Sequence, residues 1–195
     1  MGWTELAAAA LGVVNVALVV RRSVWNYPFG IAMVALYFFV FAEARLYSDA
    51  LLQIFFLAVQ LYGWRVWVRS PKADGGVAVE RMAPRGRLLW LAGAAAASAL
   101  WGLGMARFTD AAAPFADAAI AGFSVSAQML QSLRRVESWV LWIGVDLLAI
   151  GVYLYRGLEV TAGLYALFLV MSCFGLWSWW RQPRAGAAGP APSSS

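Results

Sequence analysis

The sequence predicts an all-α integral membrane protein with seven transmembrane helices in a 3+1+3 arrangement. The composition, the spacing of the apolar runs and a weak internal repeat support this prediction. Of the 195 residues, 63% are hydrophobic and 13% are charged, and the mean hydropathy is +0.69. Soluble domains of this length are nearer half apolar and a quarter charged. Most of this chain must therefore be surrounded by lipid.

A bilayer core about 30 Å thick needs roughly 20 apolar residues per helix. Apolar runs bounded by charge, Pro or Gly give seven candidate spans, at about residues 4–20, 24–43, 48–68, 87–106, 114–132, 138–155 and 160–180. These spans leave room only for short loops, so residues 1–181 are predicted to form one transmembrane domain. Residues 182–195 consist largely of Ala, Gly, Pro and Ser, a composition that predicts a disordered tail.

The basic residues predict the orientation of the chain. With the N-terminus outside, the inner segments hold twelve of them: Arg21, Arg22, Arg65, Arg69, Lys72, Arg81, Arg85, Arg87, Arg134, Arg135, Arg181 and Arg184. The outer segments hold three: Arg45, Arg107 and Arg156. Because short cytoplasmic loops carry an excess of Lys and Arg, we expect the N-terminus outside, the C-terminus in the cytoplasm and the longest loop, about 69–86, on the cytoplasmic side.

The chain repeats itself weakly at a shift of about 113 residues. Each copy has an amide, an Arg pair six residues later, then a Trp and a Gly, and two closing tryptophans. The first copy has Asn15, Arg21, Arg22, Trp25, Gly30, Trp64 and Trp67, and the second has Gln128, Arg134, Arg135, Trp139, Gly144, Trp177 and Trp180. This predicts repeats at about 4–68 and 114–180, joined by a linker helix at about 87–106. The linker helix inverts the chain, so both triplets run in the same direction, as in transporters with midplane sites.

Asp146 lies deep in an otherwise apolar span, where an ionisable side chain is a functional candidate. Trp139, Trp142 and Asp146 fall at i, i+3 and i+7, on one helix face. A flat organic cation suits such a stripe, because an indole face attracts a cation by roughly 0.5–2 kcal/mol and the carboxylate has the opposite charge. The alternative is a buried Asp that caps a neighbouring helix, with the tryptophans in an interfacial belt.

A second polar stripe runs along the third span, where Asp49, Gln53, Phe56 and Gln60 share a face. Gln53 is expected to bind substrate, because a carboxamide can bond to sugar hydroxyls or to another carboxamide. The alternative is hydrogen bonding between helices, which is common for Gln in membranes. For Gln60 and Asp49 this alternative is at least as good.

Three further residues are candidates for substrate contact. Asn26 opens the second span and either caps that helix or reaches a ligand, with its spacing favouring the cap. Gln128 belongs to a polar face of the fifth span together with Ser124 and Gln131, and Gln131 is close enough to the inner end to be solvated. Tyr165 is a candidate lining residue of the last span.

The residue counts exclude several kinds of chemistry. The chain has no histidine, the usual general base and metal ligand, and its single cysteine, Cys173, cannot form an intramolecular disulfide or a thiolate cluster. We expect no metal and no cofactor. An intramembrane enzyme and a purely structural bundle are the rival interpretations. The expected partners are a small-molecule substrate and the bilayer, without nucleic acid, and a homo-oligomer is left open.

Several ordered motifs resemble the PnuC family of vitamin transporters over nearly the whole chain. They are Trp25-Asn26-Tyr27-Pro28-Phe29-Gly30, Leu46-Tyr47-Ser48-Asp49-Ala50-Leu51-Leu52-Gln53, Tyr62-Gly63-Trp64, Glu137-Ser138-Trp139-Val140-Leu141-Trp142, Gly157-Leu158, Thr161-Ala162 and Leu164-Tyr165. The resemblance implies a carrier of nicotinamide riboside in a bacterial inner membrane, with a fold similar to SWEET sugar carriers. It implies facilitated diffusion, made net inward by phosphorylation of the vitamin inside the cell.

By position, Gln53 matches the family's glutamine, and Trp139 and Trp142 match its substrate-stacking tryptophans. Asp146 departs from the asparagine of some members. Thiamine or riboflavin as substrate, and proton coupling through a buried carboxylate, stay open as alternatives. The mononucleotide is disfavoured because no basic residue lies in the middle of a span. Tyr62 and Trp64 are the candidate gates at the cytoplasmic end.

Overall fold

The computed structural model describes residues 3–43, 47–109 and 113–182, and these residues form seven α-helices and one short β-hairpin. The helices are α1 (Trp3–Val20), α2 (Asn26–Glu43), α3 (Tyr47–Val68), α4 (Pro84–Phe108), α5 (Pro114–Ser132), α6 (Glu137–Tyr155) and α7 (Glu159–Trp180). The seven predicted ranges agree with these bounds to within a few residues. The predicted tail lies outside the described residues, apart from Gln182.

Four helices, α2, α4, α6 and α7, are long and apolar enough to cross a membrane by length and composition. Shorter apolar stretches run through α1 and α3, at Leu6–Val20 and Leu52–Val68. The remaining helix, α5, carries Asp117, Gln128 and Gln131 among its apolar residues. The described chain is thus all-helical apart from the hairpin.

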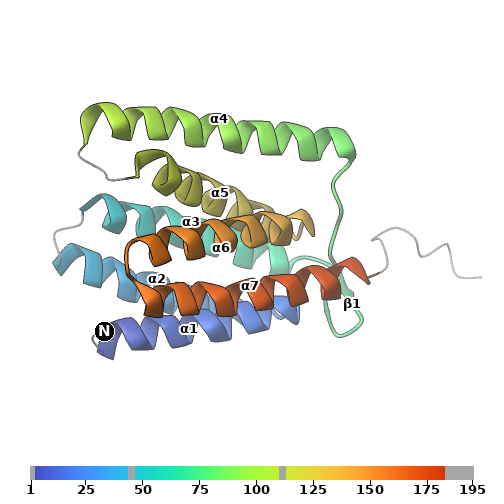
Figure 1. Ribbon diagram of the computed structural model, residues 1–195. Helices are drawn as coiled ribbons and strands as arrows, with labels where there is room; N and C mark the ends of the chain where they lie inside the picture. Colours follow the sequence, from blue (N-terminus) through green and yellow to red (C-terminus); the bar gives the residue numbers. More distant parts are fainter. Residues whose placement is uncertain (1–2, 44–46, 110–112, 183–195) are drawn as a thin grey trace, which may run out of the picture.

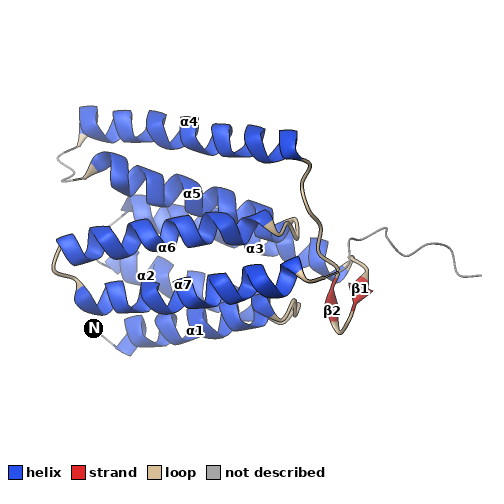
Figure 2. Cartoon of the chain, turned by 45° about the vertical axis from the view of Figure 1, so that its right-hand side comes forward, coloured by secondary structure: helices blue, strands red, loops and turns tan. Residues whose placement is uncertain are grey.

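The contacts between helices close six of them into a ring, and Figures 1 and 2 show the helices side by side, with α4 at one edge. Following the contacts, the order around the ring is α1, α2, α3, α5, α6 and α7, and α7 packs against α1. α4 lies outside this ring and packs on α5, where Ser98 contacts Gly122 and Gly102 contacts Phe115. α2 is the middle helix of α1–α3, and α6 is the middle helix of α5–α7. The side of each that is turned toward the centre of the ring is called its inner face.

The ends of α1 and α5 are alike in backbone geometry. Arg22 and Arg134 both take a left-handed conformation, with φ of 56° and 59°. The N–H of Arg22 donates to the carbonyl of Val19 at 2.8 Å, and that of Arg134 donates to Gln131 at 2.9 Å. In both turns the next N–H completes the pair of bonds of a Schellman motif. The two turns therefore correspond at a spacing of 112 residues.

This spacing corrects the register of the sequence repeat, which compared the chain with itself at about 113 residues. The structure matches Arg22 with Arg134, whereas the sequence comparison matched Arg21 with Arg134. The aromatic side chains follow the structural register, because Tyr27 and Trp139 occupy corresponding places. The sequence comparison was wrong by one residue because it aligned identical letters without knowing which arginine closes the helix.

Residues 72–80 form a strap beside the two turns. The strap begins with a hairpin of β1 (Lys72–Ala73) and β2 (Gly76–Val77), which pair antiparallel. Asp74 and Gly75 turn the chain with positive φ angles of 45° and 78°, as in the Asp-Gly turns that favour tight hairpins. The sequence had predicted a cytoplasmic loop at about residues 69–86, without a hairpin.

The strap bonds to both turns. The N–H of Val77 donates to the carbonyl of Arg22 at 3.0 Å, and the Arg22 guanidinium donates to the carbonyl of Ala73 at 2.9 Å. At the other turn, the N–H of Glu80 donates to the carbonyl of Arg134 at 3.0 Å, and the two side chains form an ion pair at 2.6 Å. Burial lowers the pKa of Arg22. The strap thus joins the end of α1 to the end of α5.

An aromatic core made of Tyr27, Trp67, Trp139 and Trp179 lies next to the strap, and all four side chains are buried. Tyr27 meets Trp67 edge to face at 5.5 Å between ring centroids, and Trp139 meets Trp179 in the same way at 5.4 Å. Such aromatic pairs stabilise by about 0.5–1.5 kcal/mol beyond their buried area. This core fixes how the two halves of the ring meet at the strap end.

Candidate substrate-binding site

A buried carboxylate lies on the inner face of α6. Asp146 is 3% exposed, and its Oδ2 accepts a hydrogen bond of 3.0 Å from the Ser172 hydroxyl on α7. The four ion pairs found among residues 3–43, 47–109 and 113–182 do not include Asp146. A buried charge without an opposite charge is costly. The geometry therefore suits a cationic ligand at Asp146.

Trp142 lies one helical turn before Asp146 and is held by α5. Its indole Nε1–H donates to Gln131 Oε1 at 2.7 Å. The ring packs against the aromatic core, and the side chain is half-buried. Gln128 lies one turn before Gln131 on α5 and is buried as well. The structure thus places Trp142, Asp146 and the two glutamines on the same side of the ring.

Tyr165 extends this polar set from α7. Ser172, the donor to Asp146, follows it by seven residues on the same helix, so the two side chains share a helix face. Its ring lies 5.2 Å from that of Tyr153, at an interplanar angle of 33°. Tyr165 thus lies on the same face of α7 as the residue that bonds the carboxylate.

Trp139 occupies a different place from Trp142, although both were expected to stack on the substrate. It is buried in the aromatic core, where its ring covers Gly175 of α7. Its Nε1–H has no hydrogen-bond partner among the described residues. Trp139 is therefore at the strap end of the stripe, and Trp142 separates it from Asp146.

The other side of the ring carries buried amides. Gln60 of α3 and Asn15 of α1 meet over Gly30 of α2, and a Cβ at Gly30 would lie 2.8 Å from Asn15 Nδ2. Gln60 is 5% exposed, and its Oε1 has no partner among the described residues. Asn15 Nδ2 donates to the carbonyl of Asn26 at 2.7 Å. Two helices on either side of α2 thus bring their amides together over its inner face.

Gly30 and Trp142 are 112 residues apart and so hold corresponding places in the two halves. At this place on α6 the side chain is the indole of Trp142. On α2 there is no side chain, and the amides of Gln60 and Asn15 occupy the space over Gly30. Gln60 corresponds in the same way to Ser172, the donor to Asp146. The two halves of the interior are therefore alike in backbone and different in chemistry.

The remaining predicted residues have diverse environments. Asn26 is buried, and its Nδ2 donates back to the carbonyl of Ser23 at 2.7 Å, so its side chain braces the turn. Gln53 is half-buried on α3, at the place that corresponds to Tyr165 on α7. The side chain of Asp49 lies outside the described residues.

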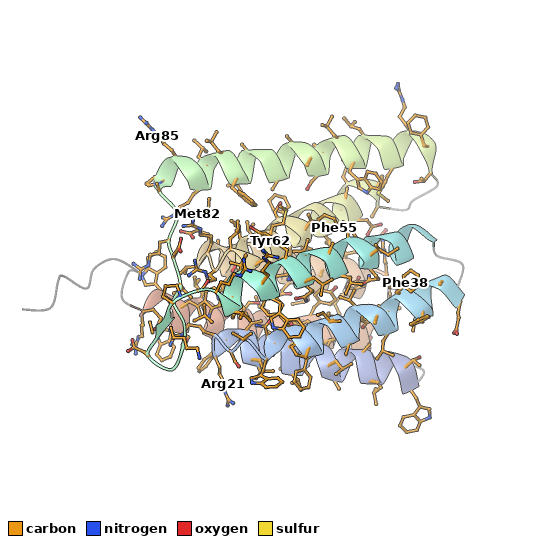
Figure 3. The ribbon with its side chains drawn as sticks, turned by 180° about the vertical axis from the view of Figure 1, so that it is seen from behind. Arg21, Phe38, Phe55, Tyr62, Met82 and Arg85 are labelled. Carbon is orange, nitrogen blue, oxygen red and sulfur yellow. The ribbon has the colours of Figure 1, made fainter. Side chains whose placement is uncertain are left out.

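The two candidate gates lie near the surface of α3. Tyr62 is 54% exposed, and Figure 3 shows it on α3. Trp64 stacks in parallel on Tyr27 at 6.5 Å and is 36% exposed. It lines two surface grooves of about 300 and 260 Å³, and Asp146 lines neither of them. These grooves lie on the outside of the ring.

Sequence reasoning missed or undervalued four residues of the interior: Asn15, Gln60, Gln131 and Ser172. Asn15 entered only as a marker of the repeat, and Gln60 was considered at least as well explained by contacts between helices. Gln131 was considered part of a polar face near the inner end. In the correct register, Ser172 of α7 corresponds to Gln60 of α3, and both side chains are buried. That register would have made Ser172 a candidate.

Comparison with known proteins gives one family. Residues 2–181 match the family model described as nicotinamide mononucleotide transporter. The nicotinamide riboside transporter PnuC of Escherichia coli is 24% identical over 92% of this chain and 85% of its own. The PnuC of Neisseria mucosa is 28% identical over 91% and 72%. The riboflavin/roseoflavin transporter RibM of Streptomyces davaonensis is 29% identical over 93% and 86%.

A solved structure agrees with these sequence matches. The crystal structure of the vitamin B3 transporter PnuC superposes with a TM-score of 0.74 at 26% identity, over 91% of this chain and 80% of the other. The resemblance drawn from the sequence motifs is thereby confirmed, and an integral membrane helical fold with it. The chain belongs to the PnuC family of membrane transporters and is a transporter, not an enzyme.

Proposed function

We propose that this protein carries nicotinamide riboside across the bacterial inner membrane. The observation that supports this most is the buried Asp146, which is bonded by Ser172, lies beside Trp142 and has no ion-pair partner among the described residues. Nicotinamide riboside contains a pyridinium ring, which is flat and positively charged. The carboxylate provides the opposite charge, and the indole provides a face for the ring.

The amides on the other side of the ring suit the rest of the substrate. The riboside has a carboxamide and ribose hydroxyls, which need both donors and acceptors. Gln60 offers a buried acceptor without a partner among the described residues, and an unpaired buried acceptor gains free energy when a donor reaches it. Gln53, Gln128, Asn26 and Tyr165 are the further residues proposed for contact with the vitamin, as is Trp139 if its ring is released from the aromatic core.

We assign α1–α3 and α5–α7 to two parallel three-helix bundles, with α4 as the inverting helix between them. The matching turns at Arg22 and Arg134 support this assignment. All seven helices are then transmembrane, with the N-terminus outside and the strap in the cytoplasm, where the basic residues of the predicted inner segments gather. Figure 3 shows two of these residues, Arg21 and Arg85, at the strap end of the helices, with their side chains pointing away from the bundle.

Transport is proposed to be facilitated diffusion, in which the bundles rock around the site. Tyr62 and Trp64 are assigned to the cytoplasmic gate. Phosphorylation of the vitamin inside the cell makes uptake net inward. Counterflow of labelled riboside in liposomes without an ion gradient tests this mechanism, and uptake that requires a proton gradient would contradict it.

The riboside is favoured over its mononucleotide, although the family model bears the name of the latter. A phosphate needs Arg or Lys partners. Among the described residues, the buried basic side chain is Arg22, and the strap occupies it. A phosphorylated substrate would therefore find no free cation beside Asp146.

Riboflavin is the second candidate substrate, because the relative named as a riboflavin transporter is 29% identical over 93% of this chain. The isoalloxazine ring is neutral and gains nothing from the charge of Asp146. Competition of the riboside, the mononucleotide, thiamine and riboflavin for the purified protein separates these substrates. We expect the riboside to bind most tightly, and Trp142→Ala to abolish that binding while the protein stays folded. Tighter binding of riboflavin than of the riboside would overturn the proposal.

A further inference from the structure

Gln131 binds two indoles that belong to different halves of the ring. Its side-chain Oε1 accepts the Nε1–H of Trp142 at 2.7 Å, and its backbone carbonyl accepts the Nε1–H of Trp67 at 3.2 Å. Trp142 lies in the substrate site on α6, and Trp67 belongs to the aromatic core and comes from α3. One buried residue of α5 is thus in contact with the proposed site and with the junction between the halves.

The corresponding residue of the first half has only one of these two bonds. Val19 occupies the place of Gln131, and its carbonyl accepts the Nε1–H of Trp179 at 3.2 Å. A valine side chain cannot accept a hydrogen bond, and Gly30 stands where Trp142 would be. An indole-to-carbonyl bond to the other half is therefore present in both halves, and the Trp179 N–H also reaches the carbonyl of Val20 at 3.3 Å. The side-chain bond to the site is found in the second half, at Gln131.

This asymmetry separates two roles of the position. The backbone bond joins the two halves of the ring. It needs no particular side chain, because the carbonyl of Val19 accepts the same kind of bond. The glutamine side chain serves Trp142 alone among the described residues, and it orients the indole through its only N–H. Gln131 Oε1 and its carbonyl are covalently joined through a short side chain, so a shift of α5 at the junction displaces the acceptor that holds Trp142.

We propose that Gln131 is a positioning residue, which holds the Trp142 indole for the vitamin and links its orientation to the Trp67 contact between the two halves. The inference rests on the proposed function. It predicts that substrate binding at the site changes the contact between the two halves at the strap end. It also predicts that loss of the Gln131 side-chain acceptor removes this effect of the substrate.

The test uses the full-length protein with a thiol reporter at the junction. Ser132 is buried beside Gly63, with its hydroxyl directed at the carbonyl of Val59. Ser132→Cys in a Cys173→Ser background gives one thiol, which a soluble reagent reaches when the halves separate. Riboside is expected to change the labelling rate of this thiol in the otherwise unsubstituted protein.

Gln131→Met keeps the length of the side chain and removes the acceptor. We expect riboside binding to weaken by about five- to tenfold, as for the loss of one buried hydrogen bond, and the riboside-dependent change in labelling to disappear. Gln131→Glu restores an acceptor and is expected to recover the labelling change. Met129→Leu is the control, because Met129 is an exposed neighbour on the same helix.

Trp142→Phe removes the same hydrogen bond from the other partner and keeps an aromatic ring. Combined with Gln131→Met, it is expected to cause no further loss of coupling, because both changes break one bond. Unaltered binding and labelling in Gln131→Met, or a Gln131→Glu variant as impaired as Gln131→Met, would overturn the inference. If the unsubstituted protein itself fails to bind riboside, the proposed function fails first, and that result is seen before any variant is made.

Discussion

The indoles of Trp67 and Trp179 lie 5.9 Å apart between ring centroids, and each donates its N–H to a carbonyl in the opposite half of the ring. Trp67 reaches Gln131, and Trp179 reaches Val19 and, at 3.3 Å, the neighbouring carbonyl of Val20. The bonds to Gln131 and Val19 are related by the same 112-residue spacing as the turns. This crossed pair connects α3 to α5 and α7 to α1, the two places where the halves meet.

Trp67→Phe and Trp179→Phe keep an aromatic ring and lose the N–H. Each buried carbonyl then has one bond fewer, and we expect each variant to lose about 1 kcal/mol of stability. Because the two sites are related by symmetry, the losses should be similar. Thermal unfolding in detergent measures the effect, with Trp101→Phe on the exposed face of α4 as the control. Unchanged melting of both variants would contradict the bonding seen here.

Gly175 gives a second test of the junction. A Cβ at this position would lie 2.5 Å from the ring of Trp139, which is itself enclosed by the aromatic core. Gly175→Ala is expected to destabilise the protein by about 1–3 kcal/mol, as overpacking does. Gly163→Ala on the same helix has no atom within 4 Å of the new Cβ and should stabilise slightly through helix propensity. Equal melting temperatures for the two variants would count against the packing of Trp139.

Asp146→Asn tests the charge in the site. Asparagine retains an oxygen for the Ser172 hydroxyl, so the change removes mainly the negative charge. We expect binding of the cationic riboside to weaken about tenfold, because a partly buried ion pair is worth roughly 1.4 kcal/mol or more. Riboflavin binding should change little. The melting temperature should stay or rise, since a buried unpaired carboxylate is lost.

Asp117→Asn is the matched control for Asp146→Asn. Asp117 bonds to Arg156 at 2.7 Å at the far end of α6 and raises the pKa of that arginine. The same chemical change is made there, away from the proposed site. If both variants weaken riboside binding equally, the charge of Asp146 has no special role.

Glu80→Gln tests the strap and its side of the membrane. Glu80 pairs with Arg134 at 2.6 Å and with Arg135 at 3.0 Å, and all three side chains are partly exposed. Partly exposed pairs contribute up to about 1 kcal/mol each. We therefore expect trypsin to cleave after Lys72, in the strap, or after Arg81, which follows the strap, several-fold faster, through local opening. The proposed orientation predicts this cleavage in inside-out vesicles only.

Glu159→Gln, at the start of α7, is the control for this experiment, because Glu159 is exposed at the opposite end of the helix bundle from the strap. Faster cleavage in right-side-out vesicles would contradict the proposed orientation. An unchanged cleavage rate in Glu80→Gln would instead show that the backbone bonds alone hold the strap.

The helices could be predicted from the sequence because an apolar run of about 20 residues has one stable solution in lipid. The strap could not be, since its two-residue strands depend on carbonyls and guanidinium groups contributed by Arg22 and Arg134. No local sequence pattern predicts such partners. The Asp-Gly turn was a signal that could have been used.

Residues of the site could be predicted from the sequence where an ionisable side chain lies within an apolar span, as Asp146 does. They were harder to predict where the side chain is neutral, because a glutamine on a membrane helix serves equally well as a contact between helices. Gln60 and Gln131 can be recognised as site candidates only from the structure, where Gln60 packs over Gly30 of α2 and Gln131 bonds to Trp142 of α6. The one-residue error in register hid the correspondence of Gln60 with Ser172.

The different side chains over Gly30 and at Trp142 affect the orientation in which the proposed substrate binds. Twofold-related backbones alone would accept a molecule in two opposite orientations with equal ease. The proposed site has an indole and an acid on one side and carboxamides on the other, so we expect a vitamin with distinct ends to bind in one orientation only. Because these two sides face each other across the ring, a vitamin that arrives from either side of the membrane is then expected to bind with the same end toward α6.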